Sequence, residues 1–439
     1  MKGSAEFVKN LKFDDLDERT IQKAKNCLLD LIGAVLGGAK TKAAEISLQF
    51  AKDLGILEQA TVWATRDKLP FRSVAFVHGT MASALDIDDG HRMAVGHPGG
   101  VVIPAAFSIA EYNKNTGKDL LEAIVCGYEV GIRVGHVLRT KISRSTSLGS
   151  GRWGSVGAAA AVAKLLRLNV EEIKQALAIS ATFSPVSPVT DDLRTNGVIP
   201  MSKFCSGWGA EVGICSALLA KRGFTGVSSA IDFSSSLLPN YGKSFEINNV
   251  YFKPFTACRW THPAIEATFQ LLNEHRELKK ESIAKITVGT FLEATHLNQP
   301  HPQTMESAQY SIPFLIGAAV IDGKIGLEQI TQNRLSDPNI LAVADKVKVL
   351  HKPEIDKDFP KLAPAEIEIE TFSGKSYTTR VDIPKGDPTN PMNDEELTDK
   401  FKNLATRSIS MASSERVIEV ICQIEKLSSI TELIDVFYL

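Results

Sequence analysis

Apolar residues recur at steps of three and four through most of the first 250 residues, which is the spacing of helices that bury one face. Ile21, Leu28 and Val35 share such a face, and Gly37-Gly38 is expected to end that helix. The same pattern predicts helices over residues 43–54, 75–85, 104–112, 120–137, 157–166, 170–183 and 209–222. Several of these segments are rich in alanine and glycine, which lets helices approach closely. A large helical bundle is therefore predicted.

The pattern changes near residue 250. Residues 284–291 and 365–372 alternate apolar and polar positions, as half-buried strands do. A Ser-Gly-Lys turn after the second segment predicts a hairpin. Further elements are expected in three places: a strand over 346–351 and helices over 264–274 and 312–320. This part is predicted to be a smaller α+β unit.

The last segment returns to helix after the sequence GDPTNPM at 386–392, with Val417 and Ile421 on one face. We expect it to pack back on the helical part of the chain. The predicted fold is mainly α, a large all-helical domain with an inserted smaller α+β lid domain. The expected boundaries are 1–249 for the first helical part, 250–392 for the lid, and 393–439 for the returning helices.

The composition, with 44% hydrophobic and 23% charged residues, is typical of an ordinary globular enzyme. The net charge of −2 creates no field that would gather nucleic acid or an anionic membrane. No stretch of 18 apolar residues occurs, and the N-terminal segment lacks the apolar core of a signal peptide. Six scattered cysteines without a Cys-x-x-Cys pair fit reduced thiols. We expect a cytoplasmic protein without nucleic-acid or membrane partners.

The densest group of titratable residues lies in the sequence ALDIDDGHRMAVGHPGG at 84–100. Asp86, Asp88, His91 and His97 are candidates for acid–base catalysis, because a helix end that enters a glycine-rich loop holds such groups in place. The alternative is that the aspartates cap the loop and His97 packs in a turn. The two histidines are six residues apart and lack the spacing of a zinc or calcium site, so no metal is predicted.

The glycine-containing sequence GSGRWG at 149–154 matches the Gly-x-Gly-x-x-Gly pattern of dinucleotide-binding sites, but no strand–helix–strand unit surrounds it. Arg152, in this string, could hold an anion at a helix start, or it could be a surface arginine over an aromatic neighbour.

Basic residues also lie in two aromatic segments. Lys203 and Lys253 are expected to pair with a carboxylate of the protein or of a ligand, and Arg259 follows in the second segment. Cys258 could be a nucleophile, although a buried structural thiol is the simpler interpretation. No Gly-x-Ser-x-Gly turn or phosphate-binding loop is present, which argues against a serine hydrolase or a nucleotide hydrolase.

Taken together, these segments resemble the MmgE/PrpD family, which includes 2-methylcitrate dehydratase, cis-aconitate decarboxylase and iminodisuccinate epimerase. The matching motifs are Ala84-Leu-Asp-Ile-Asp-Asp, Gly96-His-Pro-Gly-Gly, Val102-Ile-Pro-Ala, Gly127-Tyr-Glu-Val, Gly154-Ser-Val-Gly, Ser202-Lys-Phe, Gly223-Phe-Thr-Gly, Lys253-Pro-Phe, Ser311-Ile-Pro-Phe and Gly386-Asp-Pro-Thr-Asn-Pro-Met. The resemblance implies a homodimer, an active-site cleft between the two domains, and chemistry without a metal or organic cofactor.

The resemblance also implies a set of pocket residues. Four of them match here: Asp86, His97, Lys203 and Lys253. Four differ: Gly90 stands at the place of a threonine, Leu148 and Cys258 at the places of histidines, and Phe314 at the place of a tyrosine. The two missing histidines argue against cis-aconitate decarboxylation.

We therefore expect a cofactor-independent lyase that acts on a small di- or tricarboxylate, most simply like 2-methylcitrate dehydratase. Proton abstraction next to a carboxylate would use His97 or Asp88 as base and His91 as acid. Lys203 and Lys253, with Arg152 or Arg259, would clamp the anion. Two alternatives stay open: an epimerase with Cys258 as a second base, and a catalytically silent dimeric binding protein.

Overall fold

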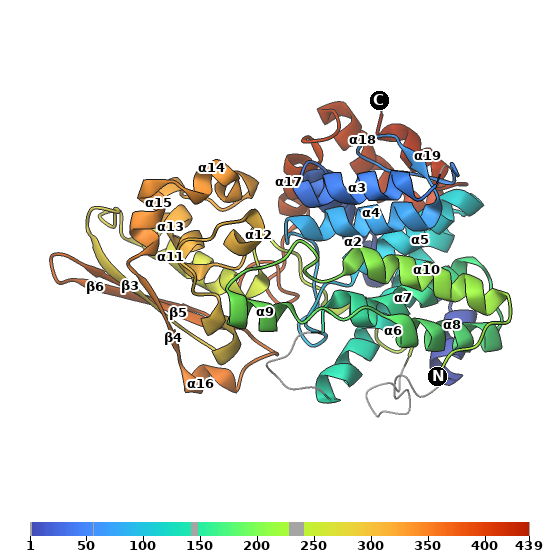
Figure 1. Ribbon diagram of the computed structural model, residues 1–439, viewed down its shortest axis with the longest axis horizontal. Helices are drawn as coiled ribbons and strands as arrows, with labels where there is room; N and C mark the ends of the chain where they lie inside the picture. The colour runs from blue at the N-terminus through green and yellow to red at the C-terminus, as the bar shows by residue number, and fades with distance from the viewer. Residues whose placement is uncertain (1, 56, 142–147, 228–240, 439) are drawn as a thin grey trace.

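The fold is known from a computed structural model, which describes residues 2–55, 57–141, 148–227 and 241–438. It is mainly α, as predicted (Figure 1). The helices before residue 250 are α1 (Lys2–Asn10), α2 (Glu18–Gly38), α3 (Lys42–Asp53), α4 (Phe71–Ala84), α5 (Gly99–Asn113), α6 (Gly117–Lys141), α7 (Ser150–Leu165), α8 (Val170–Phe183), α9 (Val189–Asn196) and α10 (Ser206–Lys221). The predicted helices are confirmed, and α2 ends at Gly38 as expected. A short hairpin, β1 (Ala60–Thr61) and β2 (Lys68–Leu69), lies between α3 and α4.

Helix α7 is buried along most of its length, between α6 and α10. Its small residues explain this position, since a Cβ atom at Gly157 would lie 2.4 Å from the carbonyl oxygen of Gly127 in α6. On the other side, a Cβ atom at Gly213 of α10 would lie 2.4 Å from Ala158. Backbones this close exclude larger side chains, so the alanine- and glycine-rich sequence fixes the centre of the helical body.

The α+β unit has a four-stranded sheet in the order β4-β3-β5-β6. The strands are β3 (Ile283–Thr290), β4 (Val347–His351), β5 (Ala365–Thr371) and β6 (Ser376–Val381), and the predicted hairpin is β5–β6. Strand β3 runs parallel to β4 and antiparallel to β5. The helices are α11 (His262–Glu274), α12 (Met305–Ala308), α13 (Ile312–Asp322), α14 (Gln332–Leu335), α15 (Pro338–Ala344) and α16 (Pro353–Asp356). Ile367 and Ile369 of β5 are buried in the core of this unit.

The chain ends in α17 (Asp394–Ala405), α18 (Met411–Cys422) and α19 (Thr431–Val436), which lie on the helical body beside the first helices (Figure 1). Phe401 and Leu404 of α17 pack on Gly33 and Gly37 of α2. Whether the α+β unit moves as a lid stays a prediction.

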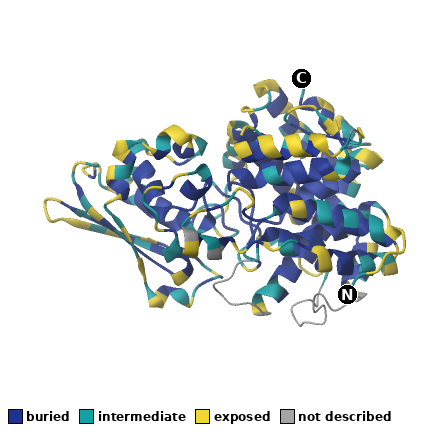
Figure 2. Cartoon of the chain, in the orientation of Figure 1, coloured by how far each residue is buried: buried dark blue, intermediate teal, exposed yellow. Residues whose placement is uncertain are grey.

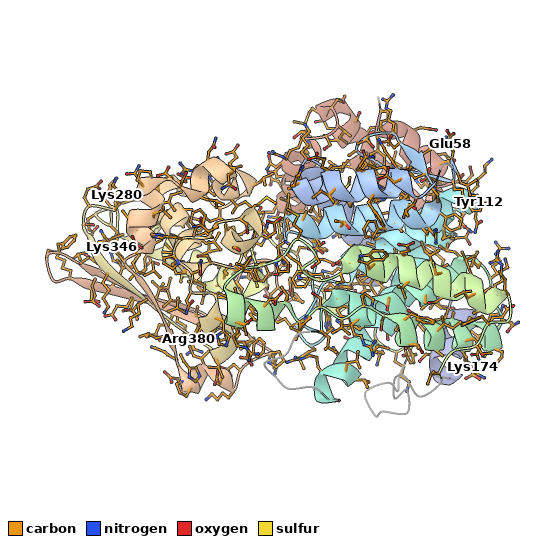
Figure 3. All side chains as sticks on the ribbon, in the orientation of Figure 1. Glu58, Tyr112, Lys174, Lys280, Lys346 and Arg380 are labelled. Carbon is orange, nitrogen blue, oxygen red and sulfur yellow. The ribbon has the colours of Figure 1, made fainter. Side chains whose placement is uncertain are left out.

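Figure 2 shows buried residues concentrated inside the helical body and around the junction of the two units. Several charged side chains lie on the outside, among them Lys280, Lys346 and Arg380 on the α+β unit and Lys174 on the helical body (Figure 3). Within the described ranges, no helix combines the length and hydropathy needed to cross a membrane.

The contact between α2 and α4 predicts a sensitive position. In Gly38→Ala, the new Cβ atom would lie 2.1 Å from the carbonyl oxygen of Met81 and force the helices apart. We expect a loss of about 3 kcal/mol in the free energy of unfolding, measured by urea denaturation. The control is Gly3→Ala, where no atom lies within 4 Å of the new methyl group. Equal midpoints for both variants would contradict this packing.

Candidate active site

A cavity of about 60 Å³ lies at the junction of the helical body and the α+β unit. Its walls come from the loop between α4 and α5, from the start of α9 and the segment after it, and from residues 251, 258–260, 310 and 359–360. The lining residues are His91, Arg92, Val95, Gly96, His97, Val189, Phe204, Tyr251, Cys258, Arg259, Trp260, Tyr310, Phe359 and Pro360. Four of the predicted site residues therefore line one cavity: His91, His97, Cys258 and Arg259.

A buried ion pair lies behind this wall. Lys253 donates through Nζ to Oδ1 of Asp86 and, at 2.8 Å, to the backbone carbonyl of the same residue, and both side chains are 0% exposed. Burial alone would raise the pKa of Asp86, but the charges of Lys253 and Lys203 outweigh it and hold the pKa well below its usual range. Asp86 is therefore an anion paired with a cation.

Lys203 is also fully buried, and its Nζ donates to Gln309 Oε1 at 2.6 Å and to the carbonyl of Ala84 at 3.1 Å. The Gln309 amide donates to the same carbonyl at 3.0 Å. Burial lowers the pKa of Lys203. Neither Lys203 nor Lys253 is among the residues that line the cavity. Their ammonium groups bind Asp86, the carbonyl of Ala84 and Gln309, and a direct clamp on the substrate stays a prediction.

His97 faces the cavity as a neutral ring. Its Nδ1 lies 2.7 Å from the carbonyl oxygen of Asp89, an acceptor only, so Nδ1 carries the proton and Nε2 keeps its lone pair. Burial and the charge of Lys253 lower the pKa of His97. Carboxylate oxygens stand on both sides of the ring, with Asp88 Oδ1 3.6 Å from Nδ1 and Asp86 Oδ1 3.8 Å from Nε2. This arrangement suits a base whose protonated form is stabilised by charge.

The next two aspartates differ from each other. Asp89 accepts hydrogen bonds from the Gly99 N–H (2.9 Å) and the Tyr128 hydroxyl (2.6 Å), so it holds the start of α5. Neither carboxylate oxygen of Asp88 has a hydrogen-bond partner among the described residues. Burial raises the pKa of Asp88 to about 6, and the nearby Asp86 and Asp89 add to the shift.

His91 lies at another edge of the cavity, with Nε2 3.4 Å from Glu246 Oε2. Its Nδ1 accepts the N–H of Ala94 at 3.3 Å, which leaves the ring proton on Nε2, toward the carboxylate. Burial raises the pKa of Glu246, but the hydrogen bond and charge of His91 outweigh it and lower the pKa to about 2.

Two other predicted residues have contrasting positions. Cys258 faces the cavity, and burial with the nearby charge of Asp86 raises the pKa of its thiol to about 12, so the thiol is protonated. Arg152 lies in α7, and its Nη1 donates to the carbonyls of Ala181 (3.1 Å) and Ser184 (3.3 Å). Arg152 thus holds the end of α8 and does not line the cavity.

Three cavity residues were missed from the sequence: Arg92, Tyr251 and Tyr310. Tyr310 is four residues before Phe314, which is buried in the core of the α+β unit. Burial and the charge of Asp86 raise the pKa of Tyr310, so its hydroxyl is a proton donor. Arg92 follows His91 directly, and Tyr251 begins the aromatic segment of Lys253. In the sequence, only this closeness to predicted site residues pointed to Arg92 and Tyr251.

Among the residues that the structure describes, two groups have the ligand types and spacing for a metal ion: Asp86, Asp88 and His97, and His91, His136 and Glu246. In the first group, the ammonium of Lys253 already occupies the cation position beside Asp86. In the second group, metal on His91 Nε2 would place the proton on Nδ1, facing the Ala94 N–H. Neither arrangement favours a metal ion, and the absence of a cofactor stays a prediction.

The raised pKa of Asp88 predicts how stability depends on pH. The unfolded side chain ionises near 3.8 and the folded one near 6, so the folded protein binds more protons in between and loses stability as pH rises through this window. In Asp88→Asn this penalty of about 3 kcal/mol is absent. The melting temperature of the variant should therefore exceed that of the wild type at pH 8 and equal it at pH 4. A difference that is constant with pH would refute the shift.

Comparison with known proteins assigns most of the chain to two domains of one family. Residues 3–247 match the MmgE/PrpD N-terminal domain, and residues 255–426 match the MmgE/PrpD C-terminal domain. Human cis-aconitate decarboxylase is 27% identical over 452 residues, which cover 98% of this chain and 92% of the relative. The mitochondrial 2-methylcitrate dehydratase of Yarrowia lipolytica is 24% identical over 402 residues, which cover 81% and 72%. The chain belongs to the MmgE/PrpD family.

Proposed function

We propose that the chain is a cofactor-independent lyase for a small di- or tricarboxylate, of the 2-methylcitrate dehydratase type, which starts by removing a proton next to a carboxylate. Relatives named as a decarboxylase and a dehydratase of such acids support the substrate class. The observation that carries the proposal is His97, a neutral ring with a free lone pair that lines the cavity between two carboxylates.

His97 is the proposed base. Nε2 takes the proton from carbon, and the imidazolium that forms is stabilised by Asp86 and Asp88, whose oxygens lie 3.8 and 3.6 Å away. Asp88 supplies negative charge only when ionised, and it does not line the cavity, so it supports His97 rather than replacing it as base. The electron pair left on the substrate is delocalised into its carboxylate.

Dehydration then expels the hydroxyl group from the neighbouring carbon, and that group leaves as water after it takes a proton. Tyr310, His91 and Cys258 line the cavity, and each side chain carries a proton that it can donate. We assign the donor role to Tyr310, because burial and the charge of Asp86 raise the pKa of its hydroxyl and keep it protonated, whereas Nε2 of His91 faces Glu246 at 3.4 Å. His91 is the alternative donor.

A specific observation keeps the epimerase as second candidate. Cys258 faces the same cavity as His97, and its thiol is protonated. A base and an acid around one carbon allow proton removal from one face and return to the other. The outcome would be inversion without loss of water. A silent binding protein is the third possibility, and it requires no proton transfer at all.

We also propose a homodimer, which the family resemblance implies, and a cytoplasmic location, which the scattered cysteines without a Cys-x-x-Cys pair favour. An apolar patch on α3 and α10 supports a dimer, because Phe50 and Trp208 are 40% and 46% exposed with their rings 6.4 Å apart. Trp208→Glu should convert the dimer to a monomer in sedimentation equilibrium. A wild-type chain that is already monomeric would refute the dimer, and a dimeric variant would refute this face.

The function predicts solvent exchange at carbon. Proton NMR of the wild type in deuterated water, with 2-methylcitrate, citrate, cis-aconitate and iminodisuccinate in turn, should show deuterium entering one substrate and a new alkene signal. His97→Gln should slow exchange by roughly 10²- to 10⁴-fold. The matched control is His301→Gln, a surface histidine paired with Asp345.

Each other outcome has a distinct meaning. Exchange with inversion and no alkene identifies the epimerase. Exchange that survives in His97→Gln refutes the assigned base. No exchange with any of these acids, from folded protein, contradicts the proposed lyase for this panel and favours the binding protein.

A further inference from the structure

Two arginines from different parts of the chain share one carboxylate at the cavity. Arg92, from the loop after α4, donates through Nε and Nη2 to the two oxygens of Asp387 at 2.7 and 2.6 Å. Arg259, from the short helix Arg259–Thr261, donates through Nη2 to the same carboxylate. Asp387 itself does not line the cavity, whereas both arginines do. The Asp387 carboxylate thus binds the two guanidinium groups on the side away from the cavity.

The charges of this cluster do not balance. Two guanidinium groups face one carboxylate, and burial keeps the neighbouring Tyr251 hydroxyl neutral by raising its pKa. Arg259 is 3% exposed, and its Nε has no hydrogen-bond partner among the described residues. Arg92 is 12% exposed at its side chain, and the bonds to Asp387 do not use its Nη1. The Nη groups of Arg259 donate to Asp387 and to the carbonyls of Pro384 and Lys385. One positive charge, the Nε–H of Arg259 and the Nη1 group of Arg92 are therefore left for an anion.

The backbone is shaped to hold this cluster. The Tyr251 ring lies under both guanidinium groups, with Cζ of Arg259 4.9 Å and Cζ of Arg92 5.8 Å from its centre. The ring fits because residue 90 is glycine, where a Cβ atom would lie 2.3 Å from the tyrosine ring. Asp387 follows Gly386, whose φ of +95° and close contact with the carbonyl of Phe252 admit no side chain.

We propose that Arg92 and Arg259 form a subsite for a second carboxylate of the substrate, with Asp387 and Tyr251 as positioning residues. The assignment deepens the proposed function and rests on it for the identity of the reacting carbon, which lies at His97 in the same cavity. A planar guanidinium binds a carboxylate through two parallel hydrogen bonds, so the subsite selects acids with at least two carboxylates. A purely structural ion pair would tie the two units together without any preference among ligands.

Binding of succinate and butyrate tests the subsite, because the two acids have the same four-carbon chain and differ in one carboxylate. We expect the wild type to bind succinate at least tenfold more tightly than butyrate in ligand-observed NMR titrations. In Arg92→Met, the succinate dissociation constant should rise by about tenfold to a hundredfold while that of butyrate stays within about twofold. The matched control is Arg72→Met, a half-exposed arginine on α4 that should change neither constant.

Arg92→Lys keeps the positive charge but cannot form two parallel hydrogen bonds with a carboxylate, so it should recover part of the succinate affinity. It also replaces Arg92→Met as the test variant if Arg92→Met does not fold. Equal binding of the two acids by the wild type would overturn the subsite. The subsite would also be overturned if Arg92→Met still preferred succinate, or if Arg92→Lys preferred succinate as strongly as the wild type does. Because the titrations need no turnover, a protein that prefers succinate through Arg92 but exchanges no deuterium would refute the lyase and keep the subsite.

Discussion

The buried ion pair between Lys253 and Asp86 is the contact on which the rest of the structure depends. Asp86 follows α4 in the helical body, and Lys253 lies at the start of the segment predicted to form the α+β unit, 167 residues along the chain. Both charges are fully buried, so removal of one partner would leave the other without compensation, at a cost of about 3–5 kcal/mol. The pair therefore fixes the two units against each other, and the cavity walls with them.

The backbone around this pair is strained in a consistent way. Asp86, Val95 and Lys203 have positive φ angles of 50°, 51° and 25°, which side chains of these types rarely adopt. Each such angle costs about 1–3 kcal/mol and persists only where the surroundings hold it. Here the lysine ammonium groups bind Asp86 and the carbonyl of Ala84, so charge and hydrogen bonding hold the loop that carries His97.

The sequence predicted the elements better than the directions of side chains. Helix α8 was predicted to the residue, and the hairpin β5–β6 followed from strict alternation around a glycine turn. The sequence also singled out His97, because the motif around it is dense in titratable groups. Which basic groups reach the cavity depends on contacts over more than 100 residues, such as Lys203 with Ala84 and Arg92 with Asp387. No local pattern encodes those contacts.

The residues that differ from the expected family pattern, among them Gly90, Cys258 and Phe314, lie close to the cavity or its supports. A threonine at Gly90 and the Tyr251 ring exclude each other, so glycine at this place is what admits an aromatic support for two arginines. Phe314 is buried in the core, while Tyr310, four residues earlier in sequence, lines the cavity. Cys258 is held by its own N–H to the carbonyl of Gln309, the residue whose side chain binds Lys203. Tyr310 and Cys258 thus line the same cavity as His97. A chain that had lost catalysis would be under no constraint to keep His97, its two carboxylates and a charged cavity together.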